Sequence, residues 1–441
     1  MNSGTLKKYL QDSATLKQCH IATMLQSAKK AHRLSFHTPG HKIGTEDITE
    51  LAFSDNLSCP KGCILEAERE IAARLHAEKS SLLTDGSTAG VLSMLYAAKT
   101  LGAKTVFACE ESHKSLFNGA KALGLELLLY PRFYRDGIPY EPSFEELVLS
   151  HGAFLERADA VFLTTPDYYG NISDLEGFGK HCKATGKLLL IDGAHGGHLH
   201  FERALHASSV ADMWVDGVHK SLPAFTQGAV VSAADERTAE ALRMGVDIFR
   251  TTSPSYPIMA SVEYAVKYPR NEKLERAVKA YQAEEGRVYR NADWTKLCAR
   301  LGKNAFLAEK ELQAEGIYPE FCDGDTILFY LSPATKFSAW KKLKARLAKL
   351  FVKYPLEREE KERQSTPAPV VFEKNEGEWI ALSQAAGRVC AGNCGLFPPC
   401  TPLVRAGDII TEEKLALLQS ADNVFGLKEG KVLVYKEKKG E

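Results

Sequence analysis

The sequence has no excess of either charge and no long hydrophobic run. Its 441 residues contain 56 basic and 56 acidic side chains, which argues against a nucleic-acid or anionic-membrane binder held by a basic surface. No apolar run approaches the roughly 20 residues that span a bilayer, and the first residues lack the apolar centre of a signal peptide. We therefore expect a cytoplasmic protein whose partner is a small molecule.

The cysteines and glycines also lack two common arrangements. Ten cysteines are scattered along the chain, and the CxxxC pairs Cys59/Cys63 and Cys390/Cys394 have no nearby second pair, so we expect reduced thiols and no metal site. The glycine pattern matches neither the Walker A motif nor GxGxxG, which disfavours a nucleotide-binding fold. All 13 histidines lie before residue 220, which suggests that several line one site.

Apolar runs and helix-prone segments alternate over the first two thirds of the chain. This alternation predicts an α/β fold in three layers, with a mostly parallel sheet between helices. We expect an N-terminal helical arm over residues 1–30, a large domain over 31–290 and a smaller α/β domain over 291–441. The charged, helix-prone segment 268–315 is interpreted as the connection between the two domains.

Two polar residues follow apolar runs that are typical of buried strands. Asp192 closes the run LLLI, and Lys220 comes shortly after MWV. Ligand sites in open α/β sheets form at the carboxyl ends of the strands. We therefore expect Asp192 and Lys220 to face one small molecule.

A strand, a turn and a helix are predicted around DGSTAG. In this arrangement the start of the helix offers free backbone N–H groups and the positive end of the helix dipole to a phosphate. Gly86, Ser87 and Thr88 are the candidate phosphate ligands. The alternative is a capped helix start without a ligand.

These features together suggest pyridoxal 5'-phosphate as the cofactor. Lys220 would bond to its aldehyde carbon, and the carboxylate of Asp192 would keep its pyridine nitrogen protonated, since a nearby opposite charge favours the charged form. The protonated ring is an electron sink for the charge left at a substrate's α-carbon. His113 lies just after a predicted strand, in the loop that precedes a helix.

Six motifs then carry a family resemblance. HTPGHK, DGSTAG, ESHKS, DGAHGGH, DGVHKSLPAFTQG and TTSPSYP follow one another in this order. They closely resemble the ornithine/lysine/arginine decarboxylase family, fold type I pyridoxal-phosphate enzymes of the aspartate-aminotransferase-like fold. The resemblance runs from about residue 31 to 265 and resumes in LFPPCTPLVRAGD. It looks like the short form of that family, without the N-terminal receiver-like domain.

The resemblance implies a role for each matching residue around the cofactor ring. Lys220 would hold the cofactor covalently, Asp192 would pair with the pyridine nitrogen, and His113 would stack on the ring. Ala194 would support the other face, and His195 would lie near the phenolic oxygen and the substrate.

The resemblance also implies a phosphate site and a second subunit. The phosphate would be surrounded by Gly86, Ser87, Thr88 and His219. The family assembles its site between two subunits, so a homodimer or larger homo-oligomer is expected, in which Thr252 and Ser253 reach the partner's cofactor.

The chain departs from the family pattern at five positions. Gly217 stands where members have a serine that binds the phosphate, while Asp85 and Asp167 replace an asparagine and a threonine. Ser58 and Cys400 replace a histidine and a glycine. Added carboxylates repel an anion unless they are paired, so Asp85 and Asp167 are also candidates for binding a substrate's distal cation.

The resulting hypothesis is decarboxylation of arginine, lysine or ornithine to the amine and carbon dioxide, as in polyamine biosynthesis, with His219 or Lys220 returning a proton to the α-carbon. An aminotransferase or lyase with the same cofactor, or a member without turnover, are alternatives. A third is a metal hydrolase that uses Asp192 with His195, His198 and His200. Arg388 and Arg405 could bind a substrate carboxylate or form surface ion pairs.

Overall fold

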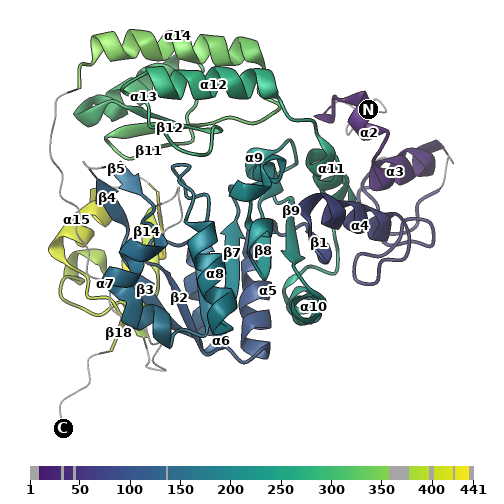
Figure 1. Cartoon of the computed structure of the whole chain (residues 1–441), viewed down its shortest axis with the longest axis horizontal. Helices are drawn as coiled ribbons and strands as arrows, with labels where there is room; N and C mark the ends of the chain where they lie inside the picture. Colours follow the sequence, from purple (N-terminus) through teal and green to yellow (C-terminus); the bar gives the residue numbers. More distant parts are fainter. Residues whose placement is uncertain are drawn as a thin grey trace.

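The centre of the molecule is a seven-stranded sheet in the order β1-β9-β8-β7-β6-β2-β3 (Figure 1). The computed structural model describes residues 9–30, 34–42, 46–135, 138–356, 377–396, 402–420 and 423–436. The strands are β1 Lys79–Leu83, β2 Thr105–Cys109, β3 Glu126–Tyr130, β6 Ala160–Thr164, β7 Leu188–Gly193, β8 Met213–Asp216 and β9 Ala229–Ala233. All pairs from β8 to β3 are parallel, whereas β9 runs antiparallel to both neighbours. The predicted mostly parallel sheet is confirmed.

Helices cover both faces of this sheet, as its apolar strands require. The successive residues Leu190 and Ile191 of β7 belong to opposite hydrophobic cores. One core includes α5 Gly86–Thr100, α6 Lys114–Leu123 and α10 Glu236–Phe249. The other includes α4 Cys63–Leu75, α7 Phe144–Arg157, α8 Leu175–Thr185 and α11 Tyr256–Lys267. The three-layer prediction is therefore confirmed, and none of the described helices is long and apolar enough to cross a membrane.

The residues that follow the large sheet in the chain form a further hydrophobic core, called the second core below. It contains the antiparallel sheet of β10 Lys296–Arg300, β12 Thr326–Tyr330 and β11 Phe321–Cys322, in that order. Helices α12 Glu272–Glu284, α13 Ala305–Ala314 and α14 Phe337–Lys353 pack on this sheet (Figure 1). The interpretation of 268–315 as a helical connection was wrong in one respect, because β10 lies inside it.

The C-terminal segment forms another core of its own. It contains β13 Gly377–Ala381, β14 Cys394–Leu396, β15 Pro402–Val404, α15 Glu412–Ser420, β16 Val424–Phe425, β17 Leu427–Lys428 and β18 Lys431–Tyr435. This core lies beside the β2 and β3 edge of the large sheet, where the small hairpin of β4 Phe133–Arg135 and β5 Ile138–Tyr140 also lies (Figure 1). Lys121 of α6 donates to the Ala391 carbonyl at 2.9 Å. The chain after the large sheet thus contains two separate cores, the first of which already includes Leu274 and Val278 of α12. The boundaries at 30 and 290 remain predictions.

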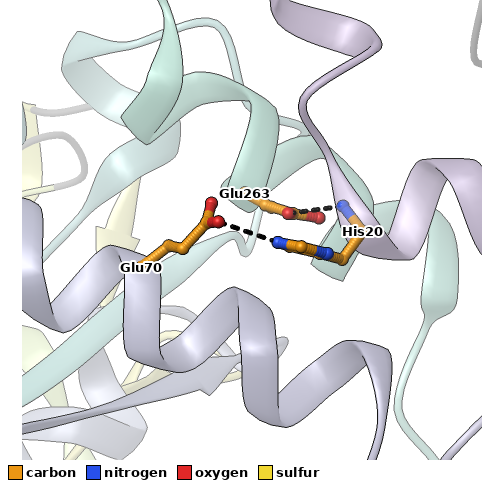
Figure 2. Close-up of side chains that lie close together, drawn as sticks. All are labelled: His20, Glu70 and Glu263. Carbon is orange, nitrogen blue, oxygen red and sulfur yellow. Dashed lines mark hydrogen bonds and ion pairs between the residues drawn. The ribbon is translucent and has the colours of Figure 1, made fainter.

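A buried ion pair attaches the N-terminal helices α2 Ser13–Leu16 and α3 His20–Lys30 to the large domain. Glu263 of α11 accepts hydrogen bonds from the His20 and Ile21 amides at 2.6 and 2.9 Å, and Lys267 donates to it at 2.8 Å. The His20 imidazole lies 2.9 Å from Glu70 of α4 (Figure 2). His20, Glu70 and Glu263 have the spacing of metal ligands, but both carboxylates already pair with the cation of Lys267.

Candidate active site

Lys220 lies in the four-residue helix α9 Val218–Ser221, which begins just after β8. Its amine lies 3.2 Å from Nε2 of His195, in the loop that follows the neighbouring strand β7. Because β7 and β8 are parallel, both residues come from the carboxyl edge of the sheet, as the apolar runs predicted. The charge of Lys220 also acts on His113 and Asp192, so the structure brings these four predicted residues together.

Asp192 is the buried carboxylate of this group. It is 2% exposed, and its Oδ1 accepts a hydrogen bond from the Ala194 amide at 3.0 Å. Burial raises its pKa, an effect that the positive charge of Lys220 opposes. A buried carboxylate with a raised pKa favours a cationic partner, and a protonated pyridine nitrogen is such a cation.

His113 is the residue that caps the start of α6. Its Nδ1 accepts from the Ser115 amide at 3.2 Å, which fixes the ring relative to the helix. Burial, with help from Lys220 and Lys114, lowers its pKa to about 3. The ring is therefore neutral at physiological pH, which suits stacking on an aromatic cofactor.

The predicted phosphate turn forms the start of α5. It is hydrogen-bonded to the loop between α9 and β9. Gly86 has φ +74°, a backbone conformation that favours glycine, and its amide donates to the Gln227 carbonyl at 2.9 Å. Its amide thus already has a protein acceptor, while Ser87 and Thr88 follow it in the first turn. Nδ1 of His219 lies 2.9 Å from the carbonyl oxygen of Gly228, the residue after Gln227.

Gly217 lies against the backbone after β7. A Cβ at this position would be 2.2 Å from the carbonyl oxygen of Ala194, far inside van der Waals contact. The family's serine therefore cannot be accommodated without a backbone shift. The close approach of Gly217 to Ala194 leaves no room here for the hydroxyl that the family places at this position.

Asp85 faces the loop that carries Thr252 and Ser253. Its Oδ2 accepts from the Thr251 amide at 3.2 Å, and it does not cap α5 with its side chain. Thr252 and Ser253 are exposed in the described chain. Their predicted contact with a second subunit is not tested by a single chain.

Asp167 forms hydrogen bonds within its own loop and an ion pair with a buried arginine. It is 4% exposed and pairs with Arg132, and its Oδ1 accepts from the Tyr169 and Asn171 amides at 2.9 and 2.7 Å. The idea that Asp167 binds a substrate's distal cation was wrong, because Asp167 is buried and already pairs with Arg132.

The two C-terminal arginines form ion pairs. Arg388 pairs with Glu378 at 2.8 Å, and Arg405 with Asp408 at 3.0 Å. The surface ion-pair alternative fits Arg388, whereas Arg405 is paired but buried, at 7% exposed. Ser58 is exposed, and Cys400 lies outside the described residues.

The histidines of HGGHLH do not form a metal centre. His198 bonds to Asp293 at 2.8 Å, and His200 to the Gly197 carbonyl at 2.7 Å. Within the described ranges, the only His/Cys/Asp/Glu group with ligand spacing is His20, Glu70 and Glu263. The geometry therefore disfavours the metal-hydrolase alternative and offers no zinc set at either CxxxC pair.

Tyr330, Lys296 and Asp293 were not predicted at the site, and they come from strands β10 and β12 or from the loop before β10. Tyr330 ends β12, and its hydroxyl lies 3.1 Å from Nδ1 of His195. Lys296 is fully buried, with its amine 3.0 Å from Asp293 and 4.5 Å from the centre of the Tyr330 ring. Tyr330 could have been suspected, because it lies near the end of the predicted strand TILFYL.

The donor set fits pyridoxal 5'-phosphate. The amine of Lys220, the buried acid Asp192 and the neutral ring of His113 supply a carbonyl-reactive group, a counter-charge and a stacking surface. The start of α5 supplies dipole and hydroxyl donors for a phosphate. The one element of the usual phosphate set that is missing is the hydroxyl at position 217.

Comparison with known proteins agrees with this geometry. Residues 45–292 match the family model "Orn/Lys/Arg decarboxylase, major domain". The chain is 28% identical to an uncharacterised protein, YaaO, of Bacillus subtilis, covering 94% of this chain and 98% of that protein. It is 25% identical to an arginine decarboxylase of Bacillus anthracis, covering 90% and 92%.

Solved structures show the same fold at low identity. The constitutive lysine decarboxylase of E. coli aligns with a TM-score of 0.67 and 19% identity, covering 95% of this chain and 82% of that one. Lysine decarboxylase A of Pseudomonas aeruginosa aligns with a TM-score of 0.71 and 16% identity, covering 95% and 80%. The chain belongs to the Orn/Lys/Arg decarboxylase family, whose cofactor is pyridoxal 5'-phosphate.

Proposed function

We propose that this protein decarboxylates a basic amino acid, arginine, lysine or ornithine, to the corresponding amine and carbon dioxide in the cytoplasm. The observation that carries the proposal is the convergence of Lys220, Asp192, His113 and His195 at the carboxyl edge of β7 and β8. The family match supports the reaction class. The amines formed are of the kind used in polyamine biosynthesis.

Each residue of this group has a distinct task. When bound, the cofactor supplies an electron sink for the charge that carbon dioxide leaves at the α-carbon. Asp192 would keep the pyridine nitrogen protonated, and the neutral ring of His113 would cover one face of the cofactor. Ala194, which is 5% exposed, lies beside Asp192 and would support the opposite face.

The proton that returns to the α-carbon is assigned to Lys220 in preference to His219. Burial and Lys220 lower the pKa of His219, so the ring is neutral. Its single proton is used at Nδ1, which donates to the Gly228 carbonyl at 2.9 Å. Nε2 of His219 then has no proton to give, whereas the amine of Lys220 does.

The phosphate is assigned to Ser87, Thr88 and His219, with Gly86 shaping the turn. His219 can donate to the phosphate from Nε2 only if the negative charge of the phosphate causes the imidazole to take up a second proton. Thr252 and Ser253 are assigned to the cofactor of a second subunit in a homodimer, since both are exposed on a loop attached to Asp85. Light scattering with and without the cofactor tests the dimer.

One observation favours a second possibility, a member that binds the cofactor without turnover. The Ala194 carbonyl excludes a hydroxyl at position 217, which weakens the phosphate site relative to the family pattern. Product analysis decides between the two possibilities.

The experiment combines a spectrum with product analysis. Purified protein plus pyridoxal 5'-phosphate should show an absorbance band at the edge of the visible range that Lys220→Ala abolishes and the exposed control Lys180→Ala keeps. The holoenzyme is then incubated with arginine, lysine, ornithine and a panel of other amino acids, and carbon dioxide and amines are measured. If the absorbance band is present but no basic substrate yields an amine, decarboxylation is contradicted and cofactor binding is retained.

A further inference from the structure

His195 has a second polar neighbour besides Lys220. The hydroxyl of Tyr330 lies 3.1 Å from Nδ1 of His195 and donates to the main-chain carbonyl of Tyr168 at 3.2 Å. Tyr330 is the last residue of β12 in the small antiparallel sheet, whereas His195 and Tyr168 belong to loops that follow strands of the large sheet. The rings of His195, Tyr168 and Tyr330 also contact one another edge to face or tilted.

The hydrogen bonds of Tyr330 determine which nitrogen of His195 carries a proton. The hydroxyl of Tyr330 donates its single hydrogen to the Tyr168 carbonyl, because a carbonyl oxygen can only accept. Burial raises the pKa of Tyr330 well above its usual value, so the hydroxyl keeps that hydrogen. Its oxygen can then only accept from His195, and Nδ1 of His195 must carry a proton.

The same environment prevents a second proton on His195. Burial lowers the pKa of this imidazole well below its usual value, and the positive charges of Lys220 and Lys296 act in the same direction. Lys296 is held close by, since its amine bonds to Asp293 and Thr295 at 3.0 Å. A neutral ring with its proton on Nδ1 leaves Nε2 as an acceptor, and Nε2 is the atom that faces Lys220 at 3.2 Å.

We propose that Tyr330 is a positioning residue that holds His195 in the Nδ1–H tautomer, so that Nε2 accepts a hydrogen bond from the amine of Lys220. This inference rests on the proposed function, in which Lys220 must be held ready when the substrate displaces it from the cofactor. The order of bonds is Lys220 to His195, His195 to Tyr330, and Tyr330 to the Tyr168 carbonyl. Tyr330, at the end of β12, thus determines that Lys220 faces the unprotonated nitrogen of His195.

The first test measures the tautomer in the protein without cofactor or substrate. Histidine is labelled with ¹⁵N, the His195 signals are assigned by their loss in His195→Gln, and the protonated nitrogen is read from the chemical shifts. We expect a proton on Nδ1 and none on Nε2 in the wild type. A proton on Nε2, or a doubly protonated ring at pH 7, would overturn the inference, and this measurement needs no Tyr330 variant.

Tyr330→Phe then removes the acceptor, and Tyr289→Phe is the matched control. Tyr289 packs near the same sheet, and its hydroxyl bonds to Thr326 at 2.7 Å, not to His195. We expect Tyr330→Phe to move a measurable share of the His195 proton to Nε2 and Tyr289→Phe to leave it on Nδ1. Unchanged His195 signals in a folded Tyr330→Phe protein would contradict the role of Tyr330.

Holoenzyme kinetics form the second arm. We expect Tyr330→Phe to lower kcat by roughly tenfold with KM within twofold, because only the geometry of Lys220 changes, while Tyr289→Phe keeps both constants. Equal kcat values for the two variants would refute the link to Lys220. If the tautomer is found as expected but no amine is formed by the wild type, the proposed function fails and the placement of the proton by Tyr330 stands.

Discussion

Gly217 and Ala194 touch so closely that the two backbones exclude any side chain between them. A Cβ on Gly217 would lie 2.2 Å from the Ala194 carbonyl oxygen and 3.0 Å from its Cα. Ala194 also donates its amide to Asp192, so the contact joins the strand end of the carboxylate to the helix of Lys220. Substitution at Gly217 should therefore disturb both Asp192 and Lys220.

Gly217→Ser should not restore the family's phosphate hydroxyl. The clash with backbone atoms should lower the free energy of unfolding by about 1–3 kcal/mol and weaken cofactor binding. Urea unfolding and a cofactor titration measure the two effects. Gly286→Ser is the control, since a Cβ there meets nothing within 4 Å; tighter cofactor binding by Gly217→Ser at unchanged stability would contradict the steric explanation.

Asp192→Asn should separate stability from catalysis. Burial raises the Asp192 pKa in the protein without cofactor, so the ionised form is costly to bury and its stability contribution falls as pH rises through the folded-state pKa. At pH 7 the asparagine variant without cofactor should be at least as stable as the wild type. With cofactor, kcat/KM should fall by roughly 100-fold or more, because the ring nitrogen loses its counter-charge.

The exposed control for this variant is Asp247→Asn on α10, whose pair with Arg243 lies at the surface. It should leave stability and turnover unchanged within about 0.5 kcal/mol. A wild-type kcat/KM in Asp192→Asn would exclude Asp192 from the pyridine nitrogen.

Asp167→Asn should affect folding and not substrate choice. Removing this carboxylate deprives the buried Arg132 of one of its two partners, the other being Glu141. Because Arg132 keeps its pair with Glu141 and only the charge-assisted bonds of Asp167 are weakened, we expect a loss of about 1–3 kcal/mol in the free energy of unfolding. The ratio of kcat/KM for arginine and ornithine should stay the same, and a changed ratio would show that Asp167 contacts substrate.

Glu68 should make stability depend on pH between about 4.5 and 7. Burial raises its pKa to about 7, although the Leu82 amide and Arg250 favour the charged form. Since the folded-state pKa lies above the unfolded value, the contribution of Glu68 is complete below pH 4.5 and is lost as pH rises through 7. Over this range the wild type should lose up to about 3 kcal/mol relative to Glu68→Gln. Urea unfolding at several pH values measures this difference, and parallel curves for the two proteins would contradict the raised pKa.

The parts of the fold and site that depend on local pattern could be predicted from the sequence. Runs such as LLLI mark strands buried on both faces, and the residues that follow them reach one edge of the sheet, which is how Asp192 and Lys220 were found. Strand β10 was missed because it begins with Lys296, a buried cation, and ends with Arg300, which leaves only three apolar residues between them. Burial of that cation depends on Asp293 and on the Tyr330 ring, which no local pattern reveals.

The same limit applies to the two unexpected acids. Asp167 looked available because nothing in the sequence singles out Arg132, which lies 35 positions earlier. Asp85 looked like a threat to a phosphate, yet its carboxylate is directed to the Thr251 amide. Whether an acid near a site is free depends on tertiary partners.

The contact between His195 and Tyr330 spans 135 positions of the chain and joins a loop of the large sheet to a strand of the small antiparallel sheet. During synthesis, His195 emerges well before Tyr330, and the first core can form while the second is still incomplete. Closing so long a loop is an unfavourable step that the packing of the second core must offset. The lysine can therefore be held in its final orientation only late in folding, so a nascent or truncated chain that ends before β12 contains every residue of the predicted constellation and still lacks a finished site.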